Sequence, residues 1–417
     1  MSYCKWWWQR DDLRYVEDSL FLGEQNLYSL AYSAGSPCYV YNSTRIKQNI
    51  LRIHCALESA SLPHCIFYAI KANRNPLLLS YVRGLGLSGI DCCSPSELLL
   101  ARQVGFFEEE ITYTGTSVSN DDLAIIARHP GIFLNCDSLS EIRRLGTLAP
   151  GREIGIRINP NIGLSYGANL KLQYSGHKTT KFGIYKDSFL EALQLAAQYN
   201  LKVTGIHCHS GWGFLNKQLP VFEMLLNELC WYVDQLKTPK YINLGGGLGV
   251  PIVKDDSPLD LEAWAKLIAK YFAPRSLKVF VEPGDYIVKD SGVLLLQVTT
   301  VERKQDKNFI YVNGGFNINL EPAFYELPLE VVPVVIRGRE TSYTDSGADW
   351  IKVTIAGNIN EVIDIFAEDI YLPPVQEDDY LAFINAGGYG SSMSSNHCMR
   401  GNFMEYFLYE RNGAFSD

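Results

Sequence analysis

The sequence lacks the features that mark membrane, secreted and nucleic-acid-binding proteins. No apolar run approaches the ~18 residues that a membrane helix needs, and the first twelve residues do not have the layout of a signal peptide. Acidic residues outnumber basic ones by 46 to 37, so the net charge of −9 provides no basic field for a nucleic acid. These absences predict a cytoplasmic protein that binds neither membranes nor nucleic-acid polymers.

Internal repeats, low-complexity tracts and flexible linkers are also missing from the 417 residues. The ten cysteines are scattered and several lie inside apolar runs, in a chain that is long enough to need no disulfide framework. We interpret them as reduced thiols, most of them buried. The length favours a large barrel with a second domain, or two to three ordinary domains.

A strand-then-helix unit recurs eight times between residues 60 and 285. Each unit is a short apolar run, an abrupt polar or glycine-rich stop and then a helical pattern, as at 188–199 and 259–272. Nearly continuous apolar runs are typical of strands that are buried on both faces. The pattern predicts an α/β fold, a TIM (β/α)8 barrel, in which the chemistry lies where the strands end. The predicted strands are 65–70, 87–92, 111–114, 131–135, 153–158, 201–207, 241–244 and 277–281.

The pattern changes after about residue 285, where strands rich in Val, Ile and Tyr alternate with turns. The stretch before Asn42 also has a β-like pattern. We therefore predict an N-terminal segment, 1–41, that joins the β domain, a barrel over 42–284 and a mostly-β C-terminal domain over 285–417. The strands predicted in this last part are 293–301, 309–312, 351–355 and 380–384.

Two charged residues are expected to face the same end of the barrel. Lys71 directly follows the first predicted strand, and Glu282 closes the last one. Partial desolvation of this lysine would lower its pKa and free its amine to form an imine with an aldehyde cofactor. A carboxylate beside a pyridine nitrogen would keep that nitrogen protonated, so that the ring accepts electrons. Taken singly, the lysine is more often a solvated strand-end residue, and the glutamate is as often a helix cap or surface acid.

A glycine run follows the strand predicted at 241–244. Gly245, Gly246 and Gly247 would let backbone N–H groups approach a phosphate closely. Such a run is more often only a tight turn. Its position on a strand where barrels of this type commonly form phosphate sites favours the functional interpretation.

His207 and His209 end the strand predicted at 201–207, and the alternation of side chains makes them face opposite ways. Opposed imidazoles do not easily chelate one metal ion, so we predict no metal site, but one core histidine and one histidine that stacks on a ring. Arg157, and Asp91 with Glu97, also stand at or just past strand ends. Each of these alone is more often structural.

Six segments, in this order, resemble the fold-type III pyridoxal-5′-phosphate (PLP) decarboxylases, the family of diaminopimelate, ornithine and arginine decarboxylases. The resemblance runs over nearly the whole chain and is greatest to the diaminopimelate decarboxylase branch. It implies an alanine racemase-like barrel that binds PLP, and the decarboxylation of an amino acid. The segments are YAIKAN at 68–73, KFGI at 181–184, GIHCH at 205–209, GGGLG at 245–249, EPG at 282–284 and GYGSSMSSN at 388–396.

The resemblance assigns roles to particular residues. It implies that Lys71 holds the cofactor, His209 stacks on its ring and Glu282 pairs with the ring nitrogen. The family builds its active site at a homodimer interface, so we expect a homodimer with shared active sites. The further cofactor contacts that it implies are Asp91, Arg157, Gly245, Gly246, Gly247 and Tyr389. The substrate contacts that it implies are Asp285, Glu321, Tyr325, Glu361 and Tyr389.

Several positions depart from the family pattern. Asp285 replaces the arginine of Glu-Pro-Gly-Arg and Trp212 replaces a phosphate-binding serine, so the phosphate contacts are expected to be rearranged. Glu321 stands where the diaminopimelate enzymes have an arginine for the distal carboxylate, and an acid there repels a carboxylate or pairs with an amine. Asn360 stands where the family has the cysteine that reprotonates Cα, and asparagine cannot act as an acid. The loop at 396–401 also differs.

These observations predict a PLP-dependent decarboxylase of an amino acid, or of a conjugate that bears one, with altered recognition of the distal group. Three alternatives stay open: a true meso-diaminopimelate decarboxylase, a PLP-dependent amino-acid racemase and an inactive PLP-binding paralogue. Racemases of the alanine racemase type place an arginine at the pyridine nitrogen, which leaves a poorer electron sink, so Glu282 favours decarboxylation. Some proteins with this barrel bind PLP without catalysis, and those are short single barrels, whereas this chain has a second domain.

Overall fold

The computed structural model describes residues 6–167, 169–176, 178–336 and 350–410. The chain divides into two compact units. The barrel unit comprises Lys47–Val250 and Ser257–Ile287, and the sheet unit comprises Met1–Ile46, Pro251–Asp256 and Val288–Asp417. In the part of the chain that the structure describes, no helix combines the length and the apolar character needed to cross a membrane.

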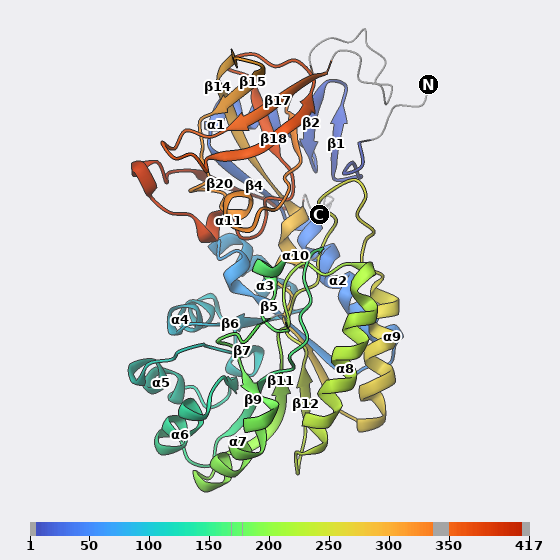
Figure 1. The fold of residues 1–417 in the computed structure, drawn as a ribbon, viewed down its shortest axis with the longest axis vertical. Coiled ribbons are helices and arrows are strands. Elements are labelled where there is room, and N and C mark those ends of the chain that lie inside the picture. The colour runs from blue at the N-terminus through green and yellow to red at the C-terminus, as the bar shows by residue number, and fades with distance from the viewer. Residues whose placement is uncertain (1–5, 168, 177, 337–349, 411–417) are drawn as a thin grey trace, which may run out of the picture. The chain divides into compact units, whose positions relative to one another are not determined.

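Eight parallel strands form a closed barrel in the barrel unit (Figure 1). They are hydrogen-bonded in the order β9, β11, β12, β13, β5, β6, β7, β8, and β8 pairs with β9 to close the ring. The eight predicted strands and the TIM barrel are therefore confirmed. The strands are β5 (His64–Ala69), β6 (Gly89–Cys92), β7 (Ile111–Tyr113), β8 (Phe133–Cys136), β9 (Glu153–Asn159), β11 (Lys202–His207), β12 (Tyr241–Asn243) and β13 (Lys278–Val281), and a short strand β10 (Ile184–Tyr185) pairs with β9.

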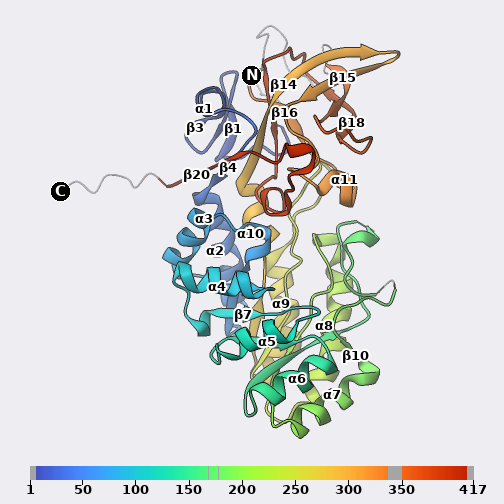
Figure 2. The same cartoon turned by 90° about the vertical axis from the view of Figure 1, so that its left-hand side faces the viewer.

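Helices follow the strands and lie on the outside of the barrel (Figures 1 and 2). Several begin at a polar cap a few residues after a strand: Ser94 accepts a hydrogen bond from the N–H of Glu97, and Ser138 accepts one from the N–H of Glu141. The caps keep the strand-to-helix loops short. The helices are α2 (Ser43–Ser59), α3 (Pro76–Leu85), α4 (Pro95–Val104), α5 (Asn120–Ala127), α6 (Leu139–Leu148), α7 (Lys186–Gln198), α8 (Leu219–Asp234), α9 (Leu261–Phe272) and the short α10 (Asp285–Val288).

An aromatic layer fills the barrel near the N-terminal ends of its strands. The rings of Tyr241 and Phe280 stack at 4.6 Å, and Phe67 packs edge-on against Phe280 at 5.1 Å. Glycine makes room for them: a Cβ at Gly205 would lie 2.0 Å from the Tyr241 ring. A glycine inside a strand, which weakens an exposed strand, is here needed for packing.

The sheet unit is built on a sheet with the strand order β16, β19, β14, β15, β17, β18. β4 pairs antiparallel with β14, and the C-terminal β20 pairs with β4, so segments from both ends of the chain extend this sheet. The strands are β4 (Cys38–Asn42), β14 (Gly292–Lys304), β15 (Lys307–Val312), β16 (Val331–Pro333), β17 (Ile351–Ala356), β18 (Ile365–Leu372), β19 (Tyr380–Phe383) and β20 (Met404–Leu408). A small sheet of β1 (Leu13–Val16), β2 (Ser19–Leu22) and β3 (Gln25–Asn26), with helices α1 (Leu27–Ala34) and α11 (Glu321–Tyr325), completes the unit.

Candidate active site

A buried carboxylate stands at the C-terminal end of β13. Glu282 is only 6% exposed, and both of its oxygens are engaged: Oε2 lies 3.0 Å from Nε2 of His207, and Oε1 accepts a hydrogen bond of 2.6 Å from the Asn243 amide. Burial acts to raise the pKa of Glu282, but the neighbouring His207 and Asn243 outweigh it and lower the pKa below its ordinary value. The carboxylate is therefore ionised at neutral pH and fixed in orientation.

Lys71 follows β5, the strand next to β13, so it opens onto the same end of the barrel as Glu282. Lys71 is exposed at its surface, and desolvation by the protein around it acts to lower its pKa, but four neighbours raise the pKa above its ordinary value, in decreasing order of effect Asp91, Cys93, Tyr174 and Glu282. The prediction of a lowered lysine pKa is therefore wrong for this structure, because nearby carboxylates stabilise the ammonium more than desolvation destabilises it. Lys71 is therefore an ammonium, stabilised by the carboxylates of Asp91 and Glu282.

Asp91 is the last residue but one of β6, the strand on the other side of β5. Its Oδ1 accepts a hydrogen bond of 3.2 Å from Oγ1 of Thr112. Burial, and then the charge of Glu282, raise the pKa of Asp91 well above its ordinary value. Three adjacent strands thus carry an acid, an amine and an acid at one end of the barrel, with Lys71 in the middle.

His209 lies just past the end of β11, where its ring is held from two directions. Its Nδ1 accepts a hydrogen bond of 3.2 Å from the N–H of Gly246, which leaves the ring proton of the neutral form on Nε2. The ring of Tyr174 lies against it, with centroids 4.8 Å apart. Burial, the Lys71 ammonium and Arg157 lower the pKa of His209 well below its ordinary value. The ring is therefore neutral.

The glycine run is packed between neighbouring backbone segments. A Cβ at Gly246 would lie 2.4 Å from the carbonyl oxygen of Glu282, so only glycine fits there. The amide of Gly245 donates to Asn243 Oδ1 and that of Gly246 donates to His209. These two amides were predicted to face a phosphate, but both are used inside the protein. Of the three amides, only that of Gly247 is left without a hydrogen bond to a described residue.

A long loop between β9 and β10 is tied to the segment after β11. The N–H groups of Leu164 and Tyr174 both donate to the carbonyl oxygen of Ser210, and the N–H of Trp212 donates to that of Leu172. Trp212, which replaces a serine of the family pattern, is buried and takes part in this backbone pairing. The pairing brings Tyr174 onto His209.

Arg157, on β9, contacts the side chains that hold the KFGI segment. Its Nη1 lies 3.2 Å from both Asp137 Oδ1 and Thr116 Oγ1, and its guanidinium lies 4.6 Å from the centre of the Phe182 ring. Asp137 also accepts the N–H of Gly183 at 2.9 Å. The arginine therefore anchors the KFGI segment, and its charge reaches His209 through space. Among the described residues, no group of three His, Cys, Asp or Glu side chains could hold a metal ion.

In the sheet unit, Glu321 begins α11 and forms an ion pair with Lys289. Nζ of Lys289 lies 2.7 and 2.6 Å from the two carboxylate oxygens, and the two residues are 2% and 3% exposed. The structure thus gives this predicted substrate contact an internal cation as partner. Lys289 drew no attention in the sequence because no motif contains it.

Asn360 and Glu361 lie on an exposed loop of the sheet unit between β17 and β18. Asp364 organises this loop by accepting hydrogen bonds from the N–H groups of Phe316 and Ile359. Glu361 lies 3.3 Å from Nε2 of His397, which comes from the divergent 396–401 loop. Of the other predicted positions, Tyr325 ends α11 and Tyr389 has a left-handed backbone at φ 57°, both half-buried, while Asp285 is buried at the start of α10.

Asn243 and Tyr174 are site residues that reasoning from the sequence missed. Asn243 ends β12, two residues before the glycine run, and that position was a usable signal. Tyr174 lies in an irregular loop, where no periodicity predicts a direction for its side chain. Only the pairing of that loop with the segment after β11 brings it to His209.

An amine, a fixed carboxylate and a neutral imidazole at one barrel end fit an aldehyde cofactor with a pyridine ring, and Gly247 leaves an amide for its phosphate. Comparisons with known proteins agree. Residues 44–289 match the family model of the pyridoxal-dependent decarboxylases, pyridoxal binding domain. The chain is 32% identical to the diaminopimelate decarboxylase of Methanothermobacter thermautotrophicus over 91% of this chain and 88% of that one, and 32% identical to that of Aquifex aeolicus over 93% and 90%.

Solved structures give the same result. Diaminopimelate decarboxylase from Helicobacter pylori, complexed with L-lysine, superimposes with a TM-score of 0.83 at 28% identity, covering 93% of this chain and 95% of that one. The enzyme from M. jannaschii gives 0.86 at 25% identity, covering 96% and 93%. Because the family model spans more than half of the chain and the two relatives cover about nine-tenths of it, this chain belongs to the pyridoxal-dependent decarboxylases and is a PLP-dependent amino-acid decarboxylase of the diaminopimelate decarboxylase branch.

Proposed function

We propose that this enzyme releases the α-carboxylate of its amino-acid substrate as CO2 with Lys71, Glu282 and His209 as the residues that hold and tune PLP. PLP, when bound, supplies a ring that accepts the electron pair left at Cα. The observation that carries the proposal is the Glu282 carboxylate, held by His207 and Asn243 on the strand beside that of Lys71.

Glu282 keeps the ring nitrogen protonated in this proposal. Its lowered pKa means that it is ionised at neutral pH, and an ionised carboxylate favours the protonated and more electron-withdrawing form of a pyridine. A cation in its place would favour the neutral nitrogen. The charge of Glu282 therefore supports decarboxylation over racemisation.

His209 offers a flat and uncharged face to the ring. Its neutral state, which burial and two nearby cations enforce, removes the cost of placing a charge against an aromatic surface. Tyr174 covers the ring of His209 and limits its rotation. Asp91, Arg157, Gly245, Gly246 and Gly247 support the cofactor from the barrel, and Tyr389 is assigned to the phosphate by the resemblance.

We further propose that the far end of the substrate carries no carboxylate. Glu321 stands where diaminopimelate decarboxylases are expected to use an arginine, and its charge is cancelled by the buried Lys289. A neutral ion pair offers no net positive charge to a second carboxylate. An amino acid that ends in an amine or amide, or one attached to a larger conjugate, fits this charge balance, with Asp285, Tyr325 and Glu361 as further substrate contacts.

The test is CO2 release from carboxyl-labelled L-ornithine, L-glutamine and meso-diaminopimelate. We expect kcat/KM on meso-diaminopimelate to be at least ~100-fold below that of the best substrate, since an unmatched buried charge costs that much. The double variant Lys289→Ala/Glu321→Arg should reduce the difference in kcat/KM between the best substrate and meso-diaminopimelate. Equal or better turnover of meso-diaminopimelate by the unaltered enzyme would refute the altered specificity, and loss of optical rotation without CO2 would indicate a racemase.

A true meso-diaminopimelate decarboxylase is the second candidate. It is favoured by the two curated relatives of that name, each 32% identical over about nine-tenths of this chain. The same CO2-release assay distinguishes a true meso-diaminopimelate decarboxylase from an enzyme with altered specificity. An enzyme that binds PLP but turns over no amino acid or conjugate would instead be an inactive paralogue.

We also propose a homodimer in the cytoplasm. Next to Asn360 and Glu361, Val362 is 92% exposed and Ile363 is 48% exposed, and paired apolar residues on a surface loop mark an interface. By the resemblance, this loop contributes to the active site of the partner. The nine cysteines in the described part of the chain are free, which suits a reducing compartment. Light scattering of Val362→Asp/Ile363→Asp should report a monomer if the loop lies in the interface.

A further inference from the structure

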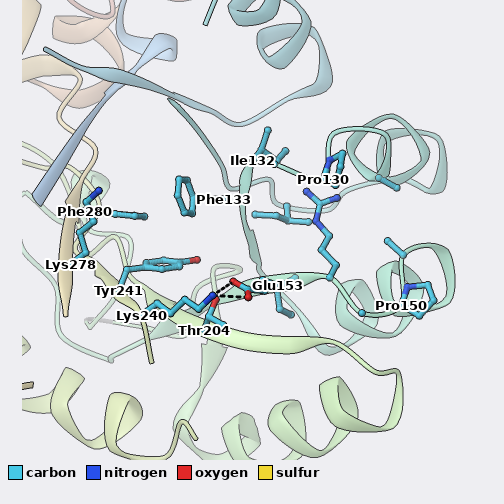
Figure 3. Close-up of a pocket in the computed structure, with 17 residues that line it drawn as sticks. Pro130, Ile132, Phe133, Pro150, Glu153, Thr204, Lys240, Tyr241, Lys278 and Phe280 are labelled. Atoms are coloured by element: carbon cyan, nitrogen blue, oxygen red, sulfur yellow. Dashed lines mark hydrogen bonds and ion pairs between the residues drawn. The ribbon is translucent and has the colours of Figure 1, made fainter. Parts of the chain in front are cut away.

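The barrel has a cavity at the end opposite to Lys71 and Glu282 (Figure 3). It has a volume of about 570 Å3 and is lined where strands begin: Phe133 is the first residue of β8, Glu153 of β9, Tyr241 of β12 and Lys278 of β13. The active-site residues follow the other ends of the same strands. The cavity is therefore a separate feature of the barrel unit, and its size is that of a small-molecule site.

One side of the cavity is an aromatic wall. Tyr241 and Phe280 stack at 4.6 Å with their planes 14° apart, and Phe133 stands edge-on to both at 5.8 and 4.9 Å. Figure 3 shows these three rings gathered on one side, with Ile132 above them. Phe133 is partly exposed, whereas Tyr241 and Phe280 are only 5% and 2% exposed, so Phe133 is the ring of this wall against which a further ring can pack.

The polar lining is positively charged, although the chain as a whole carries −9. Lys240 and Glu153 cancel each other in an ion pair of 2.6 Å at the edge of the cavity (Figure 3). Lys278 has no carboxylate partner among the described residues, and its Nζ lies 5.9 Å from the centre of the Phe280 ring. Among the lining residues, one surface lysine beside the aromatic wall is thus left uncompensated.

Arg152 adds a second cation, whose charge Glu108 offsets only through space. It is 8% exposed and donates to the carbonyl oxygens of Ile126 and His129, at 3.1 and 2.8 Å. Its Nε has no acceptor among the described residues, and no described carboxylate forms an ion pair with it. Burial lowers its pKa, the sign of a desolvated cation. An anion in the cavity would relieve this positive charge.

We propose that this cavity is a second binding site, for a small flat aromatic anion whose ring packs against Phe133, in front of the buried rings of Tyr241 and Phe280, and whose carboxylate faces Lys278. Charge selects the anion, because three lining cations face a single lining acid. The aromatic wall selects the ring. Nothing in this site takes part in decarboxylation, so the ligand is not the substrate.

The test is calorimetric titration of the PLP-loaded enzyme with 2-naphthoate, beside the neutral 2-naphthalenemethanol. We expect a Kd of roughly 0.1–1 mM for 2-naphthoate, as for a fragment-sized ligand. The neutral analogue, and Lys278→Gln with 2-naphthoate, should each bind about fivefold more weakly. Ala149→Trp, which places an indole in the cavity from its half-buried rim, should abolish binding.

Lys266→Gln is the matched control, because Lys266 is an exposed lysine on α9 outside the cavity, 74% exposed at its side chain. This variant should bind like the unaltered enzyme, and all three variants should keep its decarboxylase rate. Three outcomes would overturn the proposal: no binding of 2-naphthoate at millimolar concentration, binding that survives both Ala149→Trp and Lys278→Gln, or binding that an amino-acid substrate displaces, which would put the ligand at the other end of the barrel.

Discussion

Nε2 of His207 lies 3.0 Å from Oε2 of Glu282, in a pair of side chains that are 2% and 6% exposed. Nδ1 of the same histidine has no hydrogen-bond partner among the described residues. A proton on Nε2 of His207 suits the contact with Glu282, because Nε2 can then donate to the carboxylate. The histidine thus serves as a donor that fixes the acid on which the chemistry depends.

Removing the charge of Glu282 should disable catalysis but not cofactor binding. Glu282→Gln keeps the shape of the side chain, and we expect kcat to fall about 10²–10³-fold, as when one preorganised electrostatic contact is lost. The visible absorption of PLP bound to Lys71 should remain. Glu262→Gln, at an exposed position on α9, is the control. A near-normal rate in Glu282→Gln would remove this residue from the mechanism.

His209 should make the apoenzyme less stable in mild acid. Its folded-state pKa is depressed, so below the unfolded value of about 6.5 the unfolded chain binds a proton that the folded chain does not. The free energy of unfolding therefore falls as pH drops from 7.5 to 5.5, by at most ~1.4 kcal/mol per pH unit for this one group. His209→Phe keeps a flat ring without the proton, and urea unfolding at both pH values should show a smaller loss. An equal loss in both proteins would contradict the assignment.

Tyr174 should act through its ring and not through its hydroxyl. Its ring covers His209 at 4.8 Å, so Tyr174→Phe should keep kcat within ~3-fold, whereas Tyr174→Ala should lower it by about 10-fold through loss of one aromatic contact. The absorption and circular dichroism of the bound cofactor should change in the alanine variant only. If Tyr174→Phe is as slow as Tyr174→Ala, the hydroxyl delivers a proton, and a shifted pH profile of kcat should reveal it.

The ion pair of Lys289 and Glu321 should be costly to break from one side. Lys289→Met leaves a buried carboxylate unpaired, and we expect a loss of about 3–5 kcal/mol in the free energy of unfolding. Lys289→Met/Glu321→Leu removes both charges and should restore most of that stability. Urea denaturation of the single and double variants measures the difference. A single variant as stable as the parent would mean that Glu321 finds another partner.

Gly246 should tolerate no side chain. A Cβ there meets the carbonyl oxygen of Glu282 at 2.4 Å, so Gly246→Ala should cost about 1–3 kcal/mol in overpacking and weaken PLP binding. Gly84→Ala, at an exposed position on α3 with nothing within 4 Å of the new Cβ, should stabilise the protein by about 0.5–1 kcal/mol. Thermal unfolding measures the stability of both variants, and equilibrium dialysis measures their affinity for PLP. If Gly246→Ala kept normal stability and PLP affinity, the glycine loop would have to move freely.

The fold could be predicted because strands buried on both faces leave a local signature. All eight barrel strands were located within a few residues, and Lys71 and Glu282 were identified because each lies within two residues of the end of such a strand. Pairing of strands next to each other in the ring then brings their ends together. The direction of the Lys71 pKa shift was not predictable, since it depends on Asp91 and Glu282, which are 20 and 211 residues away in the chain.

The sequence by itself determined the barrel, the order of its strands and the residues that stand where they end, because hydrophobic periodicity and strand-end position are local properties. Only the tertiary structure decided which of these residues act on one another: that His207 and Asn243 hold Glu282, that Tyr174 covers His209, and that Lys289 cancels Glu321. Charge, burial and hydrogen bonding arise from neighbours in space, and a chain brings such neighbours together only once it has folded.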